Sequence, residues 1–118
     1  MLKTVVKRSG EKVPFDASKI RGAIFKANVR IATEKFSEAE LDRLTDEVVE
    51  AAGKLRTTPT VEQIQDIVEE KLIESDYAKT AKAYILYRAE HAKIRQSETD
   101  LMEIYKELTF SYAADADI

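Results

Sequence analysis

Residues 4–16 read TVVKRSGEKVPFD, and this stretch decides the fold of the chain. Two short runs rich in β-branched and apolar residues, Thr4–Val6 and Lys12–Phe15, flank Ser9-Gly10, a dipeptide typical of tight hairpin turns. The pattern predicts an antiparallel β-hairpin with a short second strand, because Pro14 cannot donate a ladder hydrogen bond. An isolated hairpin is only marginally stable in water, so we expect this one to rest on another part of the chain.

The turn also predicts which side chains share a face of the hairpin. With Ser9-Gly10 as a two-residue loop, Val6 pairs with Val13. Because side chains alternate along a strand, Val6, Val13 and Phe15 then share one face, and Lys7 lies on the other.

Four amphipathic helices are predicted after the hairpin, because apolar residues recur at helical spacing behind four start signals. These signals are Asp16, the capping boxes Ser37-x-x-Glu40 and Thr60-x-x-Gln63, and Ser75 or Asp76. Gly53 is expected to end the second helix in a left-handed conformation. The predicted fold class is α+β and mostly α: a four-helix bundle capped by a small N-terminal β-hairpin.

The composition limits the chemistry that this chain can perform. It has 118 residues, about one domain, with no cysteine and a single histidine, His91. Disulfides, Cys-ligated zinc, iron–sulfur clusters and multi-His metal sites are excluded, and we predict no catalytic and no metal-binding residue. No apolar run approaches the roughly 20 residues that span a bilayer. A chain without cysteine is compatible with the cytoplasm, which is the expected location.

The net charge of −3 conceals an uneven distribution. Residues 1–35 hold nine Lys and Arg against three Asp and Glu, a charge of +6, whereas residues 36–118 hold 10 against 19, a charge of −9. The basic first third attracts phosphate-bearing ligands, or it docks on the acidic remainder, and composition leaves both interpretations open. Direct binding of nucleic acid is not expected from a negative net charge.

The strongest candidate for phosphate binding is the pair Lys7-Arg8 together with Lys19. Lys19 falls in the first turn of a predicted helix, where free N–H groups and the helix dipole favour anions. Ile20, Val6 and Phe15 are apolar candidates for packing against a nucleobase. The alternative is ordinary surface cations beside a core-facing Ile20, and neither a Walker motif nor Gly-x-Gly-x-x-Gly is present to exclude it.

A second candidate cluster is Tyr84, Arg88 and His91, which share one face of the predicted fourth helix. That face could stack a base and contact a phosphate, or it could be core with an arginine that reaches solvent. Glu62 and Asp66 and their acidic neighbours on the third helix favour a solvated face. A Mg²⁺ ion accompanying a nucleotide would need only one or two carboxylates.

Three segments together resemble the ATP-cone domain: VVKRSG with VPFDASKI at residues 5–20, TVEQIQDIVE at 60–69 and AKAYILYR at 81–88. The resemblance covers residues 3–95 in order, and we predict a nucleotide-binding domain over residues 1–95. ATP-cones are regulatory modules found mainly in ribonucleotide reductases. The resemblance implies ATP or dATP as the allosteric ligand, with Mg²⁺ left open. It further implies that ATP raises reductase activity and that dATP switches it off through oligomeric assembly.

The resemblance also implies which residues contact the nucleotide. They are Val5, Lys7, Arg8, Lys19, Ile20, Val61, Gln65 and Arg88. Val6, the apolar candidate named above, completes the nine residues that we expect to contact the nucleotide. Ser9 departs from the family pattern, where Asp is usual, and this departure puts the affinity in question.

Residues 96–118 are expected to form a helical extension and a linker toward a catalytic domain outside this chain, with Ser97-x-x-Asp100 as a possible new helix start. Tyr112–Ile118 resembles the linker of an anaerobic, glycyl-radical ribonucleoside-triphosphate reductase. The expected partners are nucleotide, that catalytic domain and a second copy of the chain, with no membrane. Two alternatives stay open: the cone of a transcriptional regulator of reductase genes, and a degenerate cone that serves only in oligomerisation.

Overall fold

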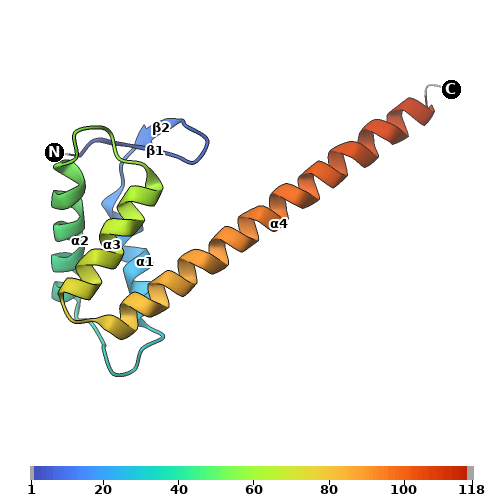
Figure 1. Ribbon diagram of the computed structural model, residues 1–118. Coiled ribbons are helices and arrows are strands. Elements are labelled where there is room, and N and C mark those ends of the chain that lie inside the picture. Colours follow the sequence, from blue (N-terminus) through green and yellow to red (C-terminus); the bar gives the residue numbers. More distant parts are fainter. Residues whose placement is uncertain (1, 117–118) are drawn as a thin grey trace. The chain divides into compact units, whose positions relative to one another are not determined.

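The computed structural model describes the backbone of residues 2–116 and the side chains of residues 2–104. Within this part of the chain there are two strands and four helices: β1 (Thr4–Val6), β2 (Lys12–Pro14), α1 (Ala17–Asn28), α2 (Glu38–Gly53), α3 (Val61–Glu74) and α4 (Ala78–Ala116) (Figure 1). The predicted α+β, mostly α fold class is confirmed. The chain divides into two compact units, Met1–Ile85 and Leu86–Ile118. The first holds the hairpin, α1 to α3 and the first two turns of α4.

The hairpin forms, but the predicted register is wrong by one residue. Val5 pairs with Val13, and Val6 pairs with Lys12. The loop has three residues instead of two: Lys7 N donates to Glu11 O at 2.8 Å, and Gly10 N donates to Lys7 O at 2.9 Å. Gly10 adopts φ +88°, the left-handed conformation that closes a turn-plus-bulge loop of this length.

A shift of one residue moves every side chain of a strand to the opposite face. Val5 and Lys7 therefore share a face with Val13 and Phe15, whereas Val6 was expected there. Val6 turns to the other side, and its N–H donates to Pro59 O at 2.9 Å.

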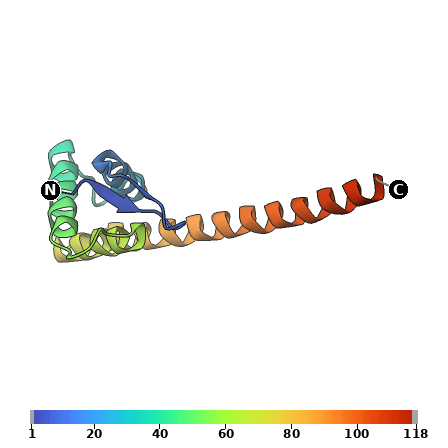
Figure 2. The same cartoon turned by 90° about the horizontal axis from the view of Figure 1, so that it is seen from above.

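A parallel bridge between Val6 and Thr60 strengthens this contact. The hairpin thus rests on the loop between α2 and α3, and the view from above shows it between α1 and α3 (Figure 2).

The core of the first unit lies where the apolar stripes of its helices meet. Ile24 of α1, Leu44 and Val48 of α2, and Val68 and Leu72 of α3 are fully buried. The first two turns of α4 add three buried apolar side chains, Ala81, Ala83 and Tyr84. Burial of these stripes explains why helices of ordinary length are stable here, since short helices are marginal without packing.

Local signals placed three helix starts correctly. Asp16 caps α1 by accepting from Ser18 N at 3.0 Å. Thr60 and Gln63 form the complete capping box at the start of α3. Ser37 caps α2, but the box is only half formed, because the carboxylate of Glu40 binds Arg43 and Tyr77 instead.

The predicted left-handed cap at Gly53 is wrong, because among the described residues only Gly10 and Asp76 have positive φ. Asp76, at φ +63°, instead ends α3. Its N–H donates to Ile73 O at 3.0 Å and that of Tyr77 donates to Leu72 O at 2.9 Å, the pattern of a Schellman motif. Asp76 therefore terminates one helix and does not cap the next.

The start of α4 is capped by a side chain from a distant loop. The carboxylate of Glu34 accepts from Lys79 N at 3.3 Å and from Thr80 N and Oγ1 at 2.8 Å. Asn28, at the end of α1, holds this loop: it donates to Glu34 O and to Thr80 Oγ1, and it accepts from Phe36 N. Three segments are therefore tied together at this end of the unit.

The second unit consists of the rest of α4. The helix runs unbroken through Ser97, so the suggested restart there is not observed, and it includes residues 112–116 of the expected linker. Residues 117 and 118 of that linker lie outside the described part. Among the described helices, none is both long enough and apolar enough to cross a membrane.

Candidate functional site

A cavity of about 440 Å³ lies within the first unit, bordered by the hairpin, α1, α3 and the start of α4. We call it the hairpin cavity. Ligand pockets commonly have volumes of about 300–1,000 Å³. It is lined by Val5, Lys7, Val13, Pro14, Phe15, Asp16, Lys19, Ile20, Ala23, Val61, Ile64, Gln65, Val68 and Tyr84.

Most of the wall is apolar, and each element contributes to it for a local reason. The observed register turns Val5, Val13 and Phe15 toward the helices. Val61, Ile64 and Val68 recur at the spacing of one helix face, and Val68 continues into the core. Such a wall suits a flat, weakly polar group such as an aromatic ring system.

Two lysines supply positive charge to the cavity. Lys7 enters from the hairpin and Lys19 from the first turn of α1. Within the described residues, the ammonium of Lys7 makes no hydrogen bond or ion pair. The two cations come from separate elements, and each lysine acts as a mobile point charge. Together they are suited to binding an extended anion.

Asp16 adds one carboxylate to the same wall. Hydrogen bonds from the hydroxyl and the backbone N–H of Ser18, with a smaller effect from the charge of Lys19, hold the pKa of Asp16 below its ordinary value. Asp16 thus stays ionised as the cap of α1, and it occupies Ser18 N–H, while Lys19 N–H donates to Asp16 O at 3.2 Å. Because both backbone N–H groups already donate to Asp16, an anion in the cavity would be bound mainly by the lysine side chains.

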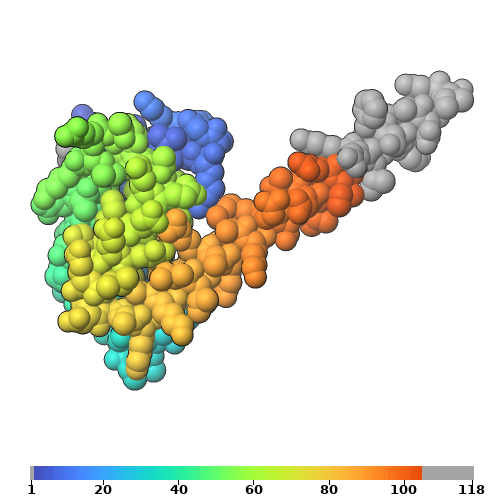
Figure 3. Space-filling view, in the orientation of Figure 1, coloured from blue at the N-terminus to red at the C-terminus, as the bar shows by residue number. Residues whose placement is uncertain are grey.

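Arg8 lies at the edge of the hairpin cavity. Its Nε is 2.7 Å from Oε1 of Glu62, and its Nη2 is 3.5 Å from Oε1 of Gln65, which lines the cavity. The space-filling view shows the hairpin standing out from the body of the unit near the start of α3 (Figure 3). Arg8 therefore connects the tip of the hairpin to α3.

Six of the nine residues expected to contact a ligand line this one cavity: Val5, Lys7, Lys19, Ile20, Val61 and Gln65. Arg8 borders it through Gln65. Val6 is not among the lining residues, because the register turns it toward the α2–α3 loop. Arg88 lies in the second unit.

Sequence reasoning missed part of the wall. Ile64 and Val68 also line the cavity, and their spacing from Val61, three and seven residues, places all three on one helix face. The cluster of Tyr84, Arg88 and His91 is divided between the two units. Tyr84, 3% exposed, belongs to the first unit, while the ring of His91 packs at 4.2 Å from that of Tyr87 in the second.

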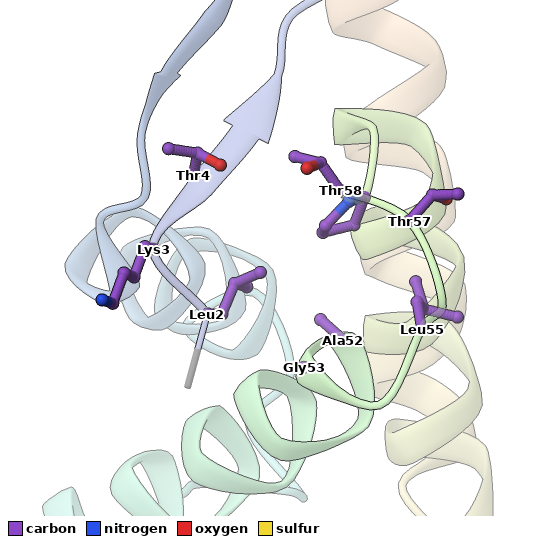
Figure 4. Close-up of a pocket in the computed structure, with 9 residues that line it drawn as sticks. Leu2, Lys3, Thr4, Ala52, Gly53, Leu55, Thr57 and Thr58 are labelled. Atoms are coloured by element: carbon purple, nitrogen blue, oxygen red, sulfur yellow. The ribbon is translucent and has the colours of Figure 1, made fainter.

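A second, smaller cavity of about 270 Å³ lies on the other side of the hairpin (Figure 4). Leu2 and Thr4 face Leu55, Thr57 and Thr58 across it. The ammonium of Lys3 points away from this loop. The cavity therefore lacks the converging cations of the hairpin cavity. Across the residues that the structure describes, no three His, Asp or Glu side chains gather where they could hold a metal ion.

Comparison with known families assigns the domain. Residues 3–93 match the model of the ATP cone domain family. The chain belongs to the ATP-cone family. The matched region contains the hairpin, α1 to α3 and the beginning of α4, and hence every residue that lines the hairpin cavity.

Relatives of this ATP cone are ribonucleotide reductases of several kinds. It is 40% identical over 119 residues to the vitamin B12-dependent ribonucleoside-diphosphate reductase of Thermoplasma acidophilum, covering 97% of this chain and 15% of the relative. It is 36% identical over 106 residues to the alpha subunit of the ribonucleoside-diphosphate reductase of Chlamydia muridarum, covering 82% and 10%. It is 34% identical over 84 residues to the anaerobic ribonucleoside-triphosphate reductase of Salmonella typhimurium, covering 71% and 11%.

The chain spans only 10–15% of the length of these three relatives. The expected similarity to ribonucleotide reductases is confirmed, and the anaerobic kind is among them.

Proposed function

We propose that this ATP cone binds ATP or dATP in the hairpin cavity and thereby regulates the activity of a ribonucleotide reductase that contains it. The observation that carries the proposal is a single cavity in which two lysines from different elements stand beside an extended apolar wall. A nucleotide has the matching division into a flat base and a polyanionic chain. The chain itself acts as a regulatory, non-catalytic part of that enzyme.

The residues of the cavity divide between the two halves of such a ligand. The apolar side chains of Val5, Ile20 and Val61 offer packing surface to the base. Lys7 and Lys19 offer charge to the phosphates, and Arg8 can grip phosphate oxygens with two parallel hydrogen bonds. A Mg²⁺ ion can accompany the phosphates, since such ions usually take one or two protein carboxylates and fill their other positions with phosphate oxygens and water.

Regulation requires that the ligand bind two states of the enzyme with different affinities, because equal affinity shifts no equilibrium. We propose that these states are different oligomers of the reductase in the cytoplasm. Residues 1–95 then form the nucleotide-binding domain, and residues 96–118 lead toward the catalytic part. The partners are the catalytic domain and a second copy of the chain, and Arg88 stays a proposed contact of the nucleotide.

The test removes the two lysines of the cavity together. A Lys7→Ala/Lys19→Ala variant should lose ATP binding, by at least about 100-fold, if each charge-assisted contact contributes about 1.5 kcal/mol. The matched control is Lys26→Ala/Lys35→Ala, which makes the same change in net charge at two exposed lysines outside the cavity. Isothermal titration calorimetry with ATP and with dATP measures both variants.

Unchanged affinity in the Lys7/Lys19 variant would refute the site. A chain whose melting temperature does not rise in millimolar ATP or dATP would refute nucleotide binding altogether, because a ligand selective for the native state must raise it. That result would favour a module that serves only in assembly.

A further inference from the structure

The ion pair between Arg8 and Glu62 joins the hairpin tip to α3 beside the hairpin cavity. Its N···O distance is 2.7 Å, and the two side chains are 36% and 47% exposed. Arg8 also reaches Gln65, one turn further along α3 on the cavity wall. The guanidinium thus contacts both an acidic residue and a residue of the cavity wall.

We propose that Glu62 is a built-in competitor for the phosphates of the ligand, and that it sets the nucleotide concentration at which the domain responds. The inference rests on the proposed function of the cavity. Without nucleotide, Glu62 holds Arg8 on α3. A bound polyphosphate takes the guanidinium from Glu62, so part of its binding free energy is used to break the existing pair.

The exposure of the pair makes this exchange feasible. An ion pair at the surface is weak, because water screens both charges and two long side chains lose freedom in forming it. A polyphosphate carries several charges and can accept two parallel hydrogen bonds from one guanidinium. The phosphate is therefore the stronger partner, and Glu62 only weakens the binding instead of preventing it.

Glu62 also distinguishes Arg8 from the other cations of the site. Lys7 has no hydrogen-bonding or ion-pair partner among the described residues, so its charge is available before the ligand arrives. Arg8 becomes available only when the ligand displaces Glu62. Phosphate recognition then has a first step on the lysine and a second step on the arginine, and Glu62 governs the second.

The experiment compares Glu62→Gln with Glu70→Gln, an equal change in charge on the same helix at an exposed residue away from the cavity. Calorimetric titration with ATP should show that Glu62→Gln binds about two- to five-fold more tightly than the wild-type chain, the range that an exposed ion pair can supply. Glu70→Gln should bind as the wild-type chain does.

A second pair of variants tests whether Glu62 acts through Arg8. In the Arg8→Gln background, adding Glu62→Gln should give no further gain, because there is no guanidinium to release. Because variants without Arg8 should bind ATP weakly, their binding is measured by the rise in melting temperature at millimolar ATP. A gain of the same size in that background would show that Glu62 merely repels phosphate and would overturn the proposal.

Affinity in Glu62→Gln equal to that of Glu70→Gln would also overturn it. A wild-type chain that does not bind ATP would overturn the proposed function and this inference together, whereas a wild-type chain that binds with an unaltered Glu62→Gln variant refutes this inference alone.

Discussion

At the hairpin end of the first unit, charged side chains border a cavity, whereas at the opposite end, where the α1–α2 loop meets the start of α4, polar side chains are tied to one another. Lys7 and Lys19 line the hairpin cavity, and the Arg8–Glu62 pair beside it is exposed. At the other end, Asn28 is 4% exposed and Thr80 is fully buried. Both ends are polar, but they use polarity differently.

The loop end satisfies its polar groups internally. Among the described residues, every buried side-chain nitrogen or oxygen has a hydrogen-bonding partner. A second cluster lies close by, in which the carboxylate of Glu40 accepts from Arg43 and from Tyr77, whose ring packs against Phe36. The hydrogen bond from Arg43, then that from Tyr77, lowers the pKa of Glu40, and the bond to Glu40 raises the pKa of Tyr77.

This difference indicates which end of the unit contributes to its stability and which end has charged side chains that can bind a ligand. Satisfied, partly buried networks resist change, because removing one member leaves another without its partner. Exposed cations near an apolar wall contribute little to the stability of the fold, and they can bind a ligand without destabilising it. If this division is correct, substitutions at one end should alter stability with unchanged affinity, and substitutions at the other should do the reverse.

Asn28→Ala should produce the largest loss of stability. The substitution removes the acceptor of Phe36 N–H and the donor to the carbonyl of Glu34. Stranding such groups and leaving a small cavity should lower the free energy of unfolding by about 3 kcal/mol. Urea denaturation followed by circular dichroism measures the change.

The same Asn28→Ala variant tests the division between the ends. At a temperature and urea concentration where it is still folded, its affinity for ATP should equal that of the wild-type chain. A Lys7→Ala variant should conversely keep its unfolding free energy to within about 0.5 kcal/mol. A large loss of ATP affinity in folded Asn28→Ala would show that the two ends are coupled and that the division is wrong.

The fold could be predicted because its signals are local. The stripes of apolar residues and the caps Asp16, Ser37 and Thr60 lie within a few positions of the helices they govern. The hairpin was predicted for the same reason. Its register was predicted wrongly, because whether Gly10 is the second residue of a two-residue loop or the third of a three-residue loop depends on backbone torsions. That single difference moved Lys7 to the cavity and Val6 away from it.

Contacts between distant segments were beyond reach from one sequence. The cap of α4 comes from Glu34, 46 positions before Thr80, and Arg8 meets Gln65 across 57 positions. Nothing in the spacing of either pair distinguishes it from many others of similar type. The cations of the candidate site could be named in advance, but the carboxylate that restrains Arg8 could be assigned only to a solvated face.

Glu34→Ala should have the next largest effect. The carboxylate is the cap of α4, and losing a cap costs about 1–2 kcal/mol of unfolding free energy. Glu34→Gln keeps an acceptor oxygen but loses the charge that favours a helix N-terminus, and it should cost about 0.5–1 kcal/mol. Urea denaturation at neutral pH compares both with the wild-type chain, and equal stability of all three would contradict the role of Glu34 as a cap.

Acid should abolish the difference between the wild-type chain and Glu34→Gln. Partial burial alone would raise the pKa of Glu34, but hydrogen bonds from the backbone and hydroxyl of Thr80 and from Lys79 N–H, with the charge of Lys79, lower it below its ordinary value of 4.5. The stabilisation that the ionised Glu34 carboxylate provides is therefore complete at neutral pH. It is lost as the pH falls below 4.5 and through the lowered pKa of Glu34 in the folded chain. Denaturation curves at about pH 3 and at neutral pH measure this, and a difference that grows in acid would contradict it.

The smallest effects on the unfolding free energy are expected from substitutions at two glycines that have equally open surroundings but different backbone conformations. A methyl group at Gly10 or at Gly22 would meet no atom within 4 Å, so packing favours neither residue. Gly10 has φ +88°, and Gly10→Ala should lower the unfolding free energy by about 1 kcal/mol through backbone strain. Gly22 lies inside α1, and Gly22→Ala should raise it by about 0.5–1 kcal/mol, because alanine restricts the unfolded chain and favours a helix. Changes of opposite sign in the unfolding free energy, measured by urea denaturation, would show that the hairpin loop depends on its left-handed residue. An unchanged unfolding free energy in Gly10→Ala would mean that the loop can adopt another turn. In that case Gly10 does not fix the register that brings Lys7 to the cavity.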